Sequence, residues 1–185
     1  MFQLSESDQQ VLLNIARGSV QSYLAGFPLA LPEIVSGPLM EVRGVFVSLH
    51  LGSELRGCIG NIHPATPLFR TVAECAISAA VGDPRFLPLT REELPSVHFE
   101  LSVLSAMEKV EDISKIEIGR DGLLISKRGV RGLLLPQVAT AYGWDRERFL
   151  SEASRKAGLR PLEWKEDATI FRFSADVFEE QPLSK

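Results

Sequence analysis

The sequence predicts an α+β fold with antiparallel sheet, and three observations support this class. Two β-rich runs flank Gly52-Ser53, as in an antiparallel hairpin. Apolar residues recur at helical spacing in two segments, residues 5–25 and 66–81. The predicted elements do not alternate strand, helix, strand along the chain, which is the order that a parallel sheet requires. We therefore expect helices packed on antiparallel sheet.

Each element carries its own signals. Ser5 is predicted to cap the first helix, which ends at Gly26. Residues 27–39 contain three prolines and indicate a long connection rather than a helix. The later elements are expected at residues 44–51 and 54–60 (hairpin), 66–81 (helix), 96–104 (strand), 116–135 (short strands), 137–142 and 146–157 (helices) and 169–180 (closing strand).

The pattern changes after residue 109, which predicts two lobes within one domain spanning residues 1–185. Short strands and two short helices follow that point, and the closing strand is expected to rejoin the first lobe. The prediction is a larger lobe of residues 1–109 and 168–185, with a smaller inserted lobe of residues 110–167.

Composition excludes several classes of protein. Apolar residues make up 45% and charged residues 24% of the chain, which indicates a folded protein rather than a disordered one. The net charge of −4 creates no general attraction for nucleic acid or an anionic membrane. The N-terminus has no secretory-signal pattern, and no apolar run approaches the ~18 residues of a membrane span. We therefore expect a cytoplasmic protein with no membrane association.

A candidate reactive cysteine, Cys58, lies in the segment LRGCIG at residues 55–60. Gly57 and Gly60 leave the backbone bare around it and are predicted to permit the close approach of a ligand. Strand alternation places Arg56 and Cys58 on one face, where the guanidinium could favour the thiolate.

The possible bases for this thiol are the three histidines of the chain. His50, His63 and His98 are all available as a base, and Glu100 could orient one of them; in the enzyme hypothesis His98 or His63 moves the proton. The same residues also fit a purely structural role, because cysteine often behaves as a small buried hydrophobe and one face of an antiparallel sheet is often solvated.

We expect neither a metal nor a cofactor. The three histidines lie in separate segments, and the two cysteines, Cys58 and Cys75, do not form a zinc-binding pair. Helical spacing assigns Cys75 to the core. The chain also has no glycine-rich phosphate-binding loop of the common types.

Two further groups of charged residues are candidates for binding. Asp83 and Arg85 flank Pro84 just after a predicted helix end, where they could bind a ligand or pair in an ordered turn. A basic cluster in the smaller lobe could contact phosphates or protect an exposed strand edge, and it consists of Arg120, Lys127, Arg128 and Arg131.

Five blocks of the sequence together resemble the AMMECR family, which is named for the Alport-syndrome, midface-hypoplasia and elliptocytosis chromosomal region. The resemblance spans residues 44–179. The blocks are LRGCIG at 55–60, DPRF at 83–86, ELSVL at 100–104, GLLLPQVA at 132–139 and WDRERFLSEASRKAGL at 144–159. LRGCIG is the most specific of them.

This resemblance implies a two-lobed α+β fold in which each lobe has an antiparallel sheet and the lobes meet at a cleft. It implies that residues 55–60 line or support the cleft, which makes Arg56 and Cys58 the leading site candidates. Memo-like and radical-SAM proteins are the implied partners, and they would bind in trans.

Two functions remain open. One is an enzyme, or an enzyme accessory, in which Cys58 attacks an electrophilic substrate with Arg56, His98 and Glu100 in support. The other is a non-catalytic binding or adapter module for such a partner or for nucleic acid.

Overall fold

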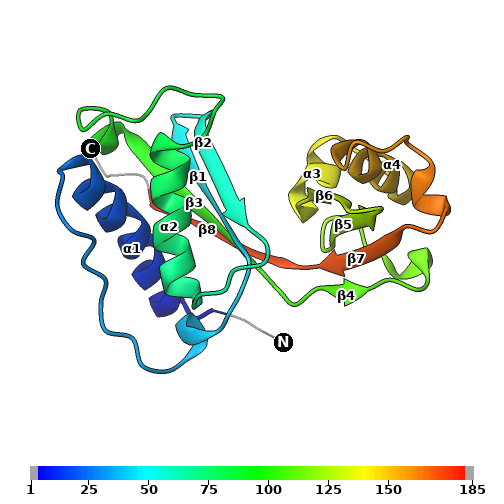
Figure 1. The fold of residues 1–185 in the computed structure, drawn as a ribbon, viewed down its shortest axis with the longest axis horizontal. Coiled ribbons are helices and arrows are strands. Elements are labelled where there is room, and N and C mark those ends of the chain that lie inside the picture. The colour runs from blue at the N-terminus through cyan, green and yellow to red at the C-terminus, as the bar shows by residue number, and fades with distance from the viewer. Residues whose placement is uncertain (1–3, 182–185) are drawn as a thin grey trace. The chain divides into compact units, whose positions relative to one another are not determined.

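The computed structural model describes residues 4–181, which form two compact units. The first unit holds the described residues up to Leu104 and from Asp176 onward, and the second is Ser105–Ala175. Within the described residues, each unit contains one four-stranded antiparallel sheet (Figure 1). The predicted α+β class with two antiparallel sheets is therefore confirmed.

The first unit packs two long helices against one face of its sheet, whose strand order is β2-β1-β3-β8 (Figure 1). Its elements are α1 (Glu6–Leu24), η1 (Pro38–Met40), β1 (Val45–Leu51), β2 (Glu54–Asn61), α2 (Leu68–Val81), η2 (Leu94–Ser96), β3 (Val97–Leu104) and β8 (Ala175–Glu179). The N-terminus of α1 is fixed by the predicted cap: the Ser5 hydroxyl accepts the Asp8 N–H, and the Asp8 carboxylate accepts the Ser5 N–H.

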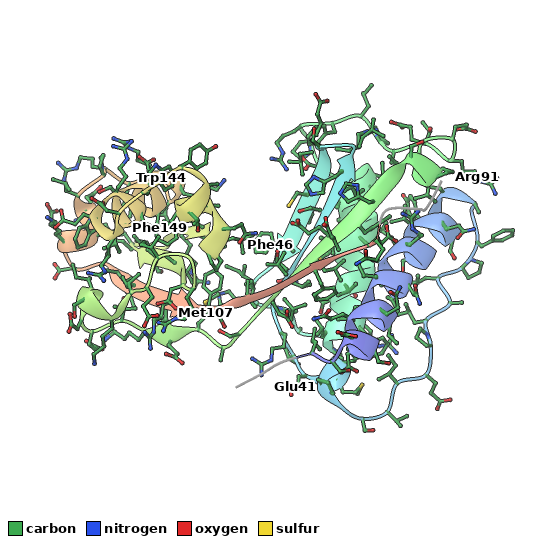
Figure 2. The ribbon with its side chains drawn as sticks, turned by 180° about the vertical axis from the view of Figure 1, so that it is seen from behind. Glu41, Phe46, Arg91, Met107, Trp144 and Phe149 are labelled. Carbon is green, nitrogen blue, oxygen red and sulfur yellow. The ribbon has the colours of Figure 1, made fainter. Side chains whose placement is uncertain are left out.

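The second unit is a smaller sheet covered by short helices. Its strand order is β4-β7-β5-β6. Its elements are β4 (Glu108–Lys109), η3 (Ile113–Lys115), β5 (Gly122–Lys127), β6 (Val130–Leu134), α3 (Pro136–Ala141), α4 (Arg146–Lys156), η4 (Glu163–Lys165) and β7 (Thr169–Phe173). Phe149 of α4, labelled in Figure 2, belongs to the same buried cluster as Leu123 and Ile125 of β5, so this unit has its own core.

The closing segment differs from the prediction of one strand over residues 169–180. It is divided at Ser174 into β7, which pairs in the second sheet, and β8, which pairs in the first. Ser105 and Ser174 are hydrogen bonded through Ser105 N–H to the Ser174 carbonyl and Ser174 N–H to Ser105 Oγ, both at 2.9 Å. The apolar alternation continues through Ser174, so the sequence pattern does not reveal the change of partner strand.

The same division places the unit boundaries after residues 104 and 175, whereas the sequence placed them after residues 109 and 167. The reason is that β4 and β7, which the prediction gave to the larger lobe, pair with each other in the second sheet. Among residues 4–181, no helix combines the length and the apolar character that crossing a bilayer requires.

Candidate functional site

The candidate site lies on the face of the first sheet that is opposite α1 and α2. Val45, Val47 and Leu49 of β1 are fully buried in the core on the helix side, so the residues between them point to the other face. We call this surface the helix-free face. It consists of Phe46, Ser48 and His50 of β1, Leu55, Cys58 and Gly60 of β2, and His98, Glu100 and Ser102 of β3.

Strand register brings a thiol, a hydroxyl and a carboxylate into one row of this face. Ser48 is aligned with Cys58 on one side and with Glu100 on the other. Directly opposed residues of antiparallel strands share a face. The Ser48 hydroxyl donates a hydrogen bond to Cys58 Sγ at 3.3 Å, and the thiol is partly buried. The sequence identified Cys58 and Glu100 as candidates but missed Ser48, which joins them.

The next row contains two of the three histidines. His50 and His98 are aligned across β1 and β3, and their rings stack with centroids 5.1 Å apart and planes 18° apart. His98 Nε2 lies 3.7 Å from a carboxylate oxygen of Glu179 on β8. His50 Nε2 is buried and has no hydrogen-bond partner among the described residues. Within the same residues, neither imidazole is hydrogen bonded to Cys58, so the Cys–His–Glu arrangement that the composition allowed is not hydrogen bonded through either of them.

A β-bulge at Arg56 places Cys58 on this face. The turn at residues 52–53 aligns Leu51 with Glu54 and His50 with Leu55, but the next aligned pair is Leu49 with Gly57. The extra residue of β2 is therefore Arg56. Without it, the register set by the turn would align Cys58 with Val47 and direct the thiol into the core.

Arg56 itself is held away from the thiol, contrary to its predicted role. Its guanidinium donates to both carboxylate oxygens of Glu93, at 3.1 and 3.2 Å, and to the carbonyl of Leu87 at 3.0 Å. The Arg56 hydrogen bonds lower the pKa of Glu93 below its usual value. Arg56 thus anchors the bulge to the segment between α2 and β3, and its charge is neutralised there.

Asp83 and Arg85 together bind both backbone groups of Cys58. The Asp83 carboxylate accepts the Cys58 N–H at 2.9 Å, and Arg85 Nη2 donates to the Cys58 carbonyl at 3.3 Å. Arg85 also forms two hydrogen bonds to the Asp83 carboxylate, at 2.9 and 2.6 Å. These bonds satisfy the outer edge of β2, which is the edge strand of its sheet. We call this arrangement the Asp83–Arg85 clamp.

The charges of Asp83 and Arg85 stabilise each other within the Asp83–Arg85 clamp. The Asp83 side chain is only 2% exposed, and the Arg85 hydrogen bond holds the pKa of its carboxyl well below the usual range despite burial. The Asp83 hydrogen bond raises the pKa of Arg85, and the charge of a Cys58 thiolate adds to that increase. Arg85 is therefore a cation that interacts electrostatically with Cys58, whereas the guanidinium of Arg56 is bound to Glu93.

Gly57 and Gly60 accommodate the protein's own packing instead of leaving space for a ligand. A Cβ on Gly57 would lie 2.2 Å from the Ala79 carbonyl oxygen of α2. A Cβ on Gly60 would lie 2.3 Å from the ring of Phe46, which Figure 2 labels. The bare backbone predicted from the sequence thus allows close contact with α2 on one face and with an aromatic ring on the other.

The remaining candidates are not part of the helix-free face. His63 is exposed on the turn after β2, and Cys75 is buried in α2 as predicted. In the second unit, Lys127 is buried with its Nζ 3.4 Å from Glu163, and Arg120 binds Asp121, so only Arg128 and Arg131 of the predicted basic cluster are exposed without a described partner. In the described residues, no group of three or more His, Cys, Asp and Glu side chains could hold a metal ion.

Comparisons with known proteins identify the family. The AMMECR1 family profile matches residues 13–178. A protein of Methanothermobacter thermautotrophicus is 43% identical over 185 residues, covering 96% of both chains, and Protein MJ0810 of Methanocaldococcus jannaschii is 46% identical over 177 residues, covering 89% of this chain and 86% of that one.

A crystal structure supports the same relationship. Protein PH0010 of Pyrococcus horikoshii superposes with a TM-score of 0.90 at 40% sequence identity, covering 97% of this chain and 95% of that chain. Both the sequence match and the structural match extend over nearly the whole length. The chain therefore belongs to the AMMECR1 family.

Proposed function

We propose that the helix-free face is a reaction site in which Cys58 is the nucleophile and the substrate is an acyl compound. The observation that carries this proposal is the partly buried thiol that accepts a hydrogen bond from Ser48 and whose backbone the Asp83–Arg85 clamp fixes. A positioned thiol next to a hydroxyl and a cation has the components of covalent catalysis.

The proposed reaction has two balanced steps. The Cys58 thiolate attacks the substrate carbonyl carbon, a C–S bond forms, and the bond to the leaving group breaks as that group takes up a proton. Water then attacks the thioester, the C–S bond breaks, the acid is released and the thiolate is restored. Ser48 supports the sulfur through its hydroxyl, and Arg85 donates to the Cys58 carbonyl and holds the backbone beside the sulfur.

Acylation by p-nitrophenyl acetate tests this proposal. We expect peptide mapping by mass spectrometry to find the acetyl group on Cys58, formed at least about tenfold faster than on glutathione at the same pH. Cys58→Ser abolishes the labelling and Ser48→Ala slows it, while Cys75→Ser is the matched control with unchanged labelling. Acylation of Cys58 no faster than that of glutathione would reject the proposal.

A binding or adapter function is the second candidate. The observation that favours it is the Arg56–Glu93 pair, because the motif's own arginine is used to hold the backbone rather than to activate the thiol. Its partners would be the Memo-like and radical-SAM proteins that the family resemblance suggests. If Cys58→Ser retains full binding to such a partner in a pull-down while wild-type Cys58 is not acylated, the adapter function is favoured.

A further inference from the structure

We propose that His50 is the residue that gives a proton to the leaving group of the acylation step and takes one from water in the next step. This assignment rests on the proposed function of Cys58. It also narrows the substrate class to acyl compounds with a basic leaving group, such as alkyl esters or amides, because such groups depart only when protonated.

One ring nitrogen of His50 lacks a hydrogen-bond partner among the described residues. This nitrogen, Nε2, is buried. A buried polar atom without a partner is unfavourable in a folded protein, and such atoms cluster at functional sites. Because Nε2 has almost no exposed surface, a bound substrate must first displace a neighbouring side chain. An alcohol, an amine or a water molecule would then satisfy the nitrogen, and these are the groups that the two steps release or consume.

His50 lies one row away from Cys58 on the helix-free face. His50 follows Ser48 by two residues on the same strand and face, and Ser48 contacts Sγ. Two residues of a strand span about 6.6 Å. A carbonyl carbon bonded to Sγ has its leaving group one or two bonds away, and the proposal places that group on the side of the His50 ring.

Neighbouring side chains hold the His50 ring in place. Leu55 is aligned with it on β2, and the His98 ring stacks on it from β3. The titratable groups of the helix-free face beside His50 are Cys58 of β2 and His98 and Glu100 of β3, and Glu179 of β8 lies near His98 rather than near Nε2 of His50. The other charged groups of these strands are Glu54 at the turn, Arg56, which is bound to Glu93, and Asp176, which is hydrogen bonded to Leu4 and Gln9. His98 is thus a positioning residue, whereas the sequence hypothesis gave the proton transfer to His98 or His63.

Two esters that differ only in the leaving group test the assignment. The probes are p-nitrophenyl acetate, whose leaving group departs without a proton, and phenyl acetate, whose phenolate is far more basic. In His50→Gln we expect Cys58 acylation by p-nitrophenyl acetate to fall far less than acylation by phenyl acetate, and urea denaturation checks that the variant is folded. Acylation by phenyl acetate should fall by about a hundredfold, the lower end of general acid–base effects.

Each outcome is decisive. His63→Gln, on an exposed turn, is the matched control and should leave both rates unchanged. If His50→Gln lowers both rates equally, or changes neither, His50 does not transfer the proton and the assignment is overturned while the nucleophile is retained. If wild-type Cys58 is acylated by neither ester, the proposed function fails and this assignment fails with it.

Discussion

The two cysteines lie on opposite sides of one sheet and differ in nearly every physical respect. Cys75, on α2, is 5% exposed within the main core cluster, and burial raises the pKa of its thiol to about 11. Cys58, on β2, is partly exposed on the helix-free face, accepts a hydrogen bond from Ser48 and has its backbone bound by the Asp83–Arg85 clamp. The Cys75 thiol packs in the core, whereas the Cys58 thiol is held in place by hydrogen bonds to its side chain and backbone.

The difference depends on one extra residue. Because Arg56 forms a bulge, β2 changes register between Leu55 and Gly57, so Gly57 packs against α2 and Cys58 points away from it. The Arg56–Glu93 pair and the Asp83–Arg85 clamp hold the two sides of this bulge. The position of Cys58 on the helix-free face thus depends on backbone irregularity rather than on composition.

The largest expected effect is the selectivity of alkylation between the two thiols. At pH 8, iodoacetamide should modify Cys58 at least about a hundredfold faster than Cys75, because a thiol with a pKa near 11 has little thiolate and is also buried. Peptide mapping checks this result. In the denatured chain both cysteines should react, and comparable labelling of the two in the folded chain would remove the distinction between them.

Gly57→Ala should be the most destabilising of the simple glycine substitutions around the bulge. The new Cβ would lie 2.2 Å from a backbone oxygen of α2, so the strand and helix must separate, at a cost of about 3 kcal/mol in the free energy of unfolding. The matched control is Gly18→Ala in α1, where a Cβ meets nothing within 4 Å and should stabilise the chain by about 0.5–1 kcal/mol. Urea denaturation measures both changes, and equal effects would contradict the packing described.

Removal of the clamp should have an intermediate effect. Asp83→Ala leaves the Cys58 N–H without its acceptor and should lower the free energy of unfolding by about 2 kcal/mol. The folded-state pKa of Asp83 is depressed, so its stabilising contribution is present above the unfolded value of about 3.9 and is lost as the pH falls further. The stability difference between wild type and Asp83→Asn should therefore shrink between pH 6 and pH 3. A difference that grows in acid would have the wrong sign.

The smallest effect separates the two arginines. Arg85→Gln should slow iodoacetamide labelling of Cys58 by about two- to threefold, the size expected of a partly exposed charge. Arg56→Gln should leave the labelling rate unchanged and instead lower the free energy of unfolding by about 1 kcal/mol through loss of the Glu93 pair. If Arg56→Gln slowed the labelling and Arg85→Gln did not, Arg56 would be the cation that acts on the thiol, as the sequence predicted.

Much of the fold follows from local pattern, whereas the site does not. The Ser5 cap, the hairpin turn at Gly52-Ser53 and the helical burial of Cys75 depend on neighbouring residues and were all predictable. The bulge at Arg56 depends on contacts with Glu93, 37 residues away, and no alternation rule indicates it. The split of the closing strand at Ser174 likewise depends on which sheet each half joins.

The site could be predicted only as a set of candidates. Cys58, Asp83 and Arg85 were identified individually as candidates. The sequence did not predict that Asp83 and Arg85 bind the Cys58 backbone, because they lie 25 and 27 positions away from it in the chain. Ser48 could have been found from the hairpin only with the bulge already known, because an unbulged register aligns it with Gly57. The contact between His50 and His98 requires the pairing of β1 with β3, which the order of elements does not specify.

If folding makes Cys58 a better nucleophile, the same thiol must react faster in the folded chain than in the unfolded one. The rate of Cys58 acylation by p-nitrophenyl acetate is measured for the folded Cys75→Ser chain and for that chain unfolded in urea at the same pH. We expect a faster reaction in the folded chain, because only there does Ser48 donate to the sulfur and does Arg85 bind the Cys58 backbone. A slower reaction in the folded chain would show that the sheet merely shelters the thiol, and would contradict the account.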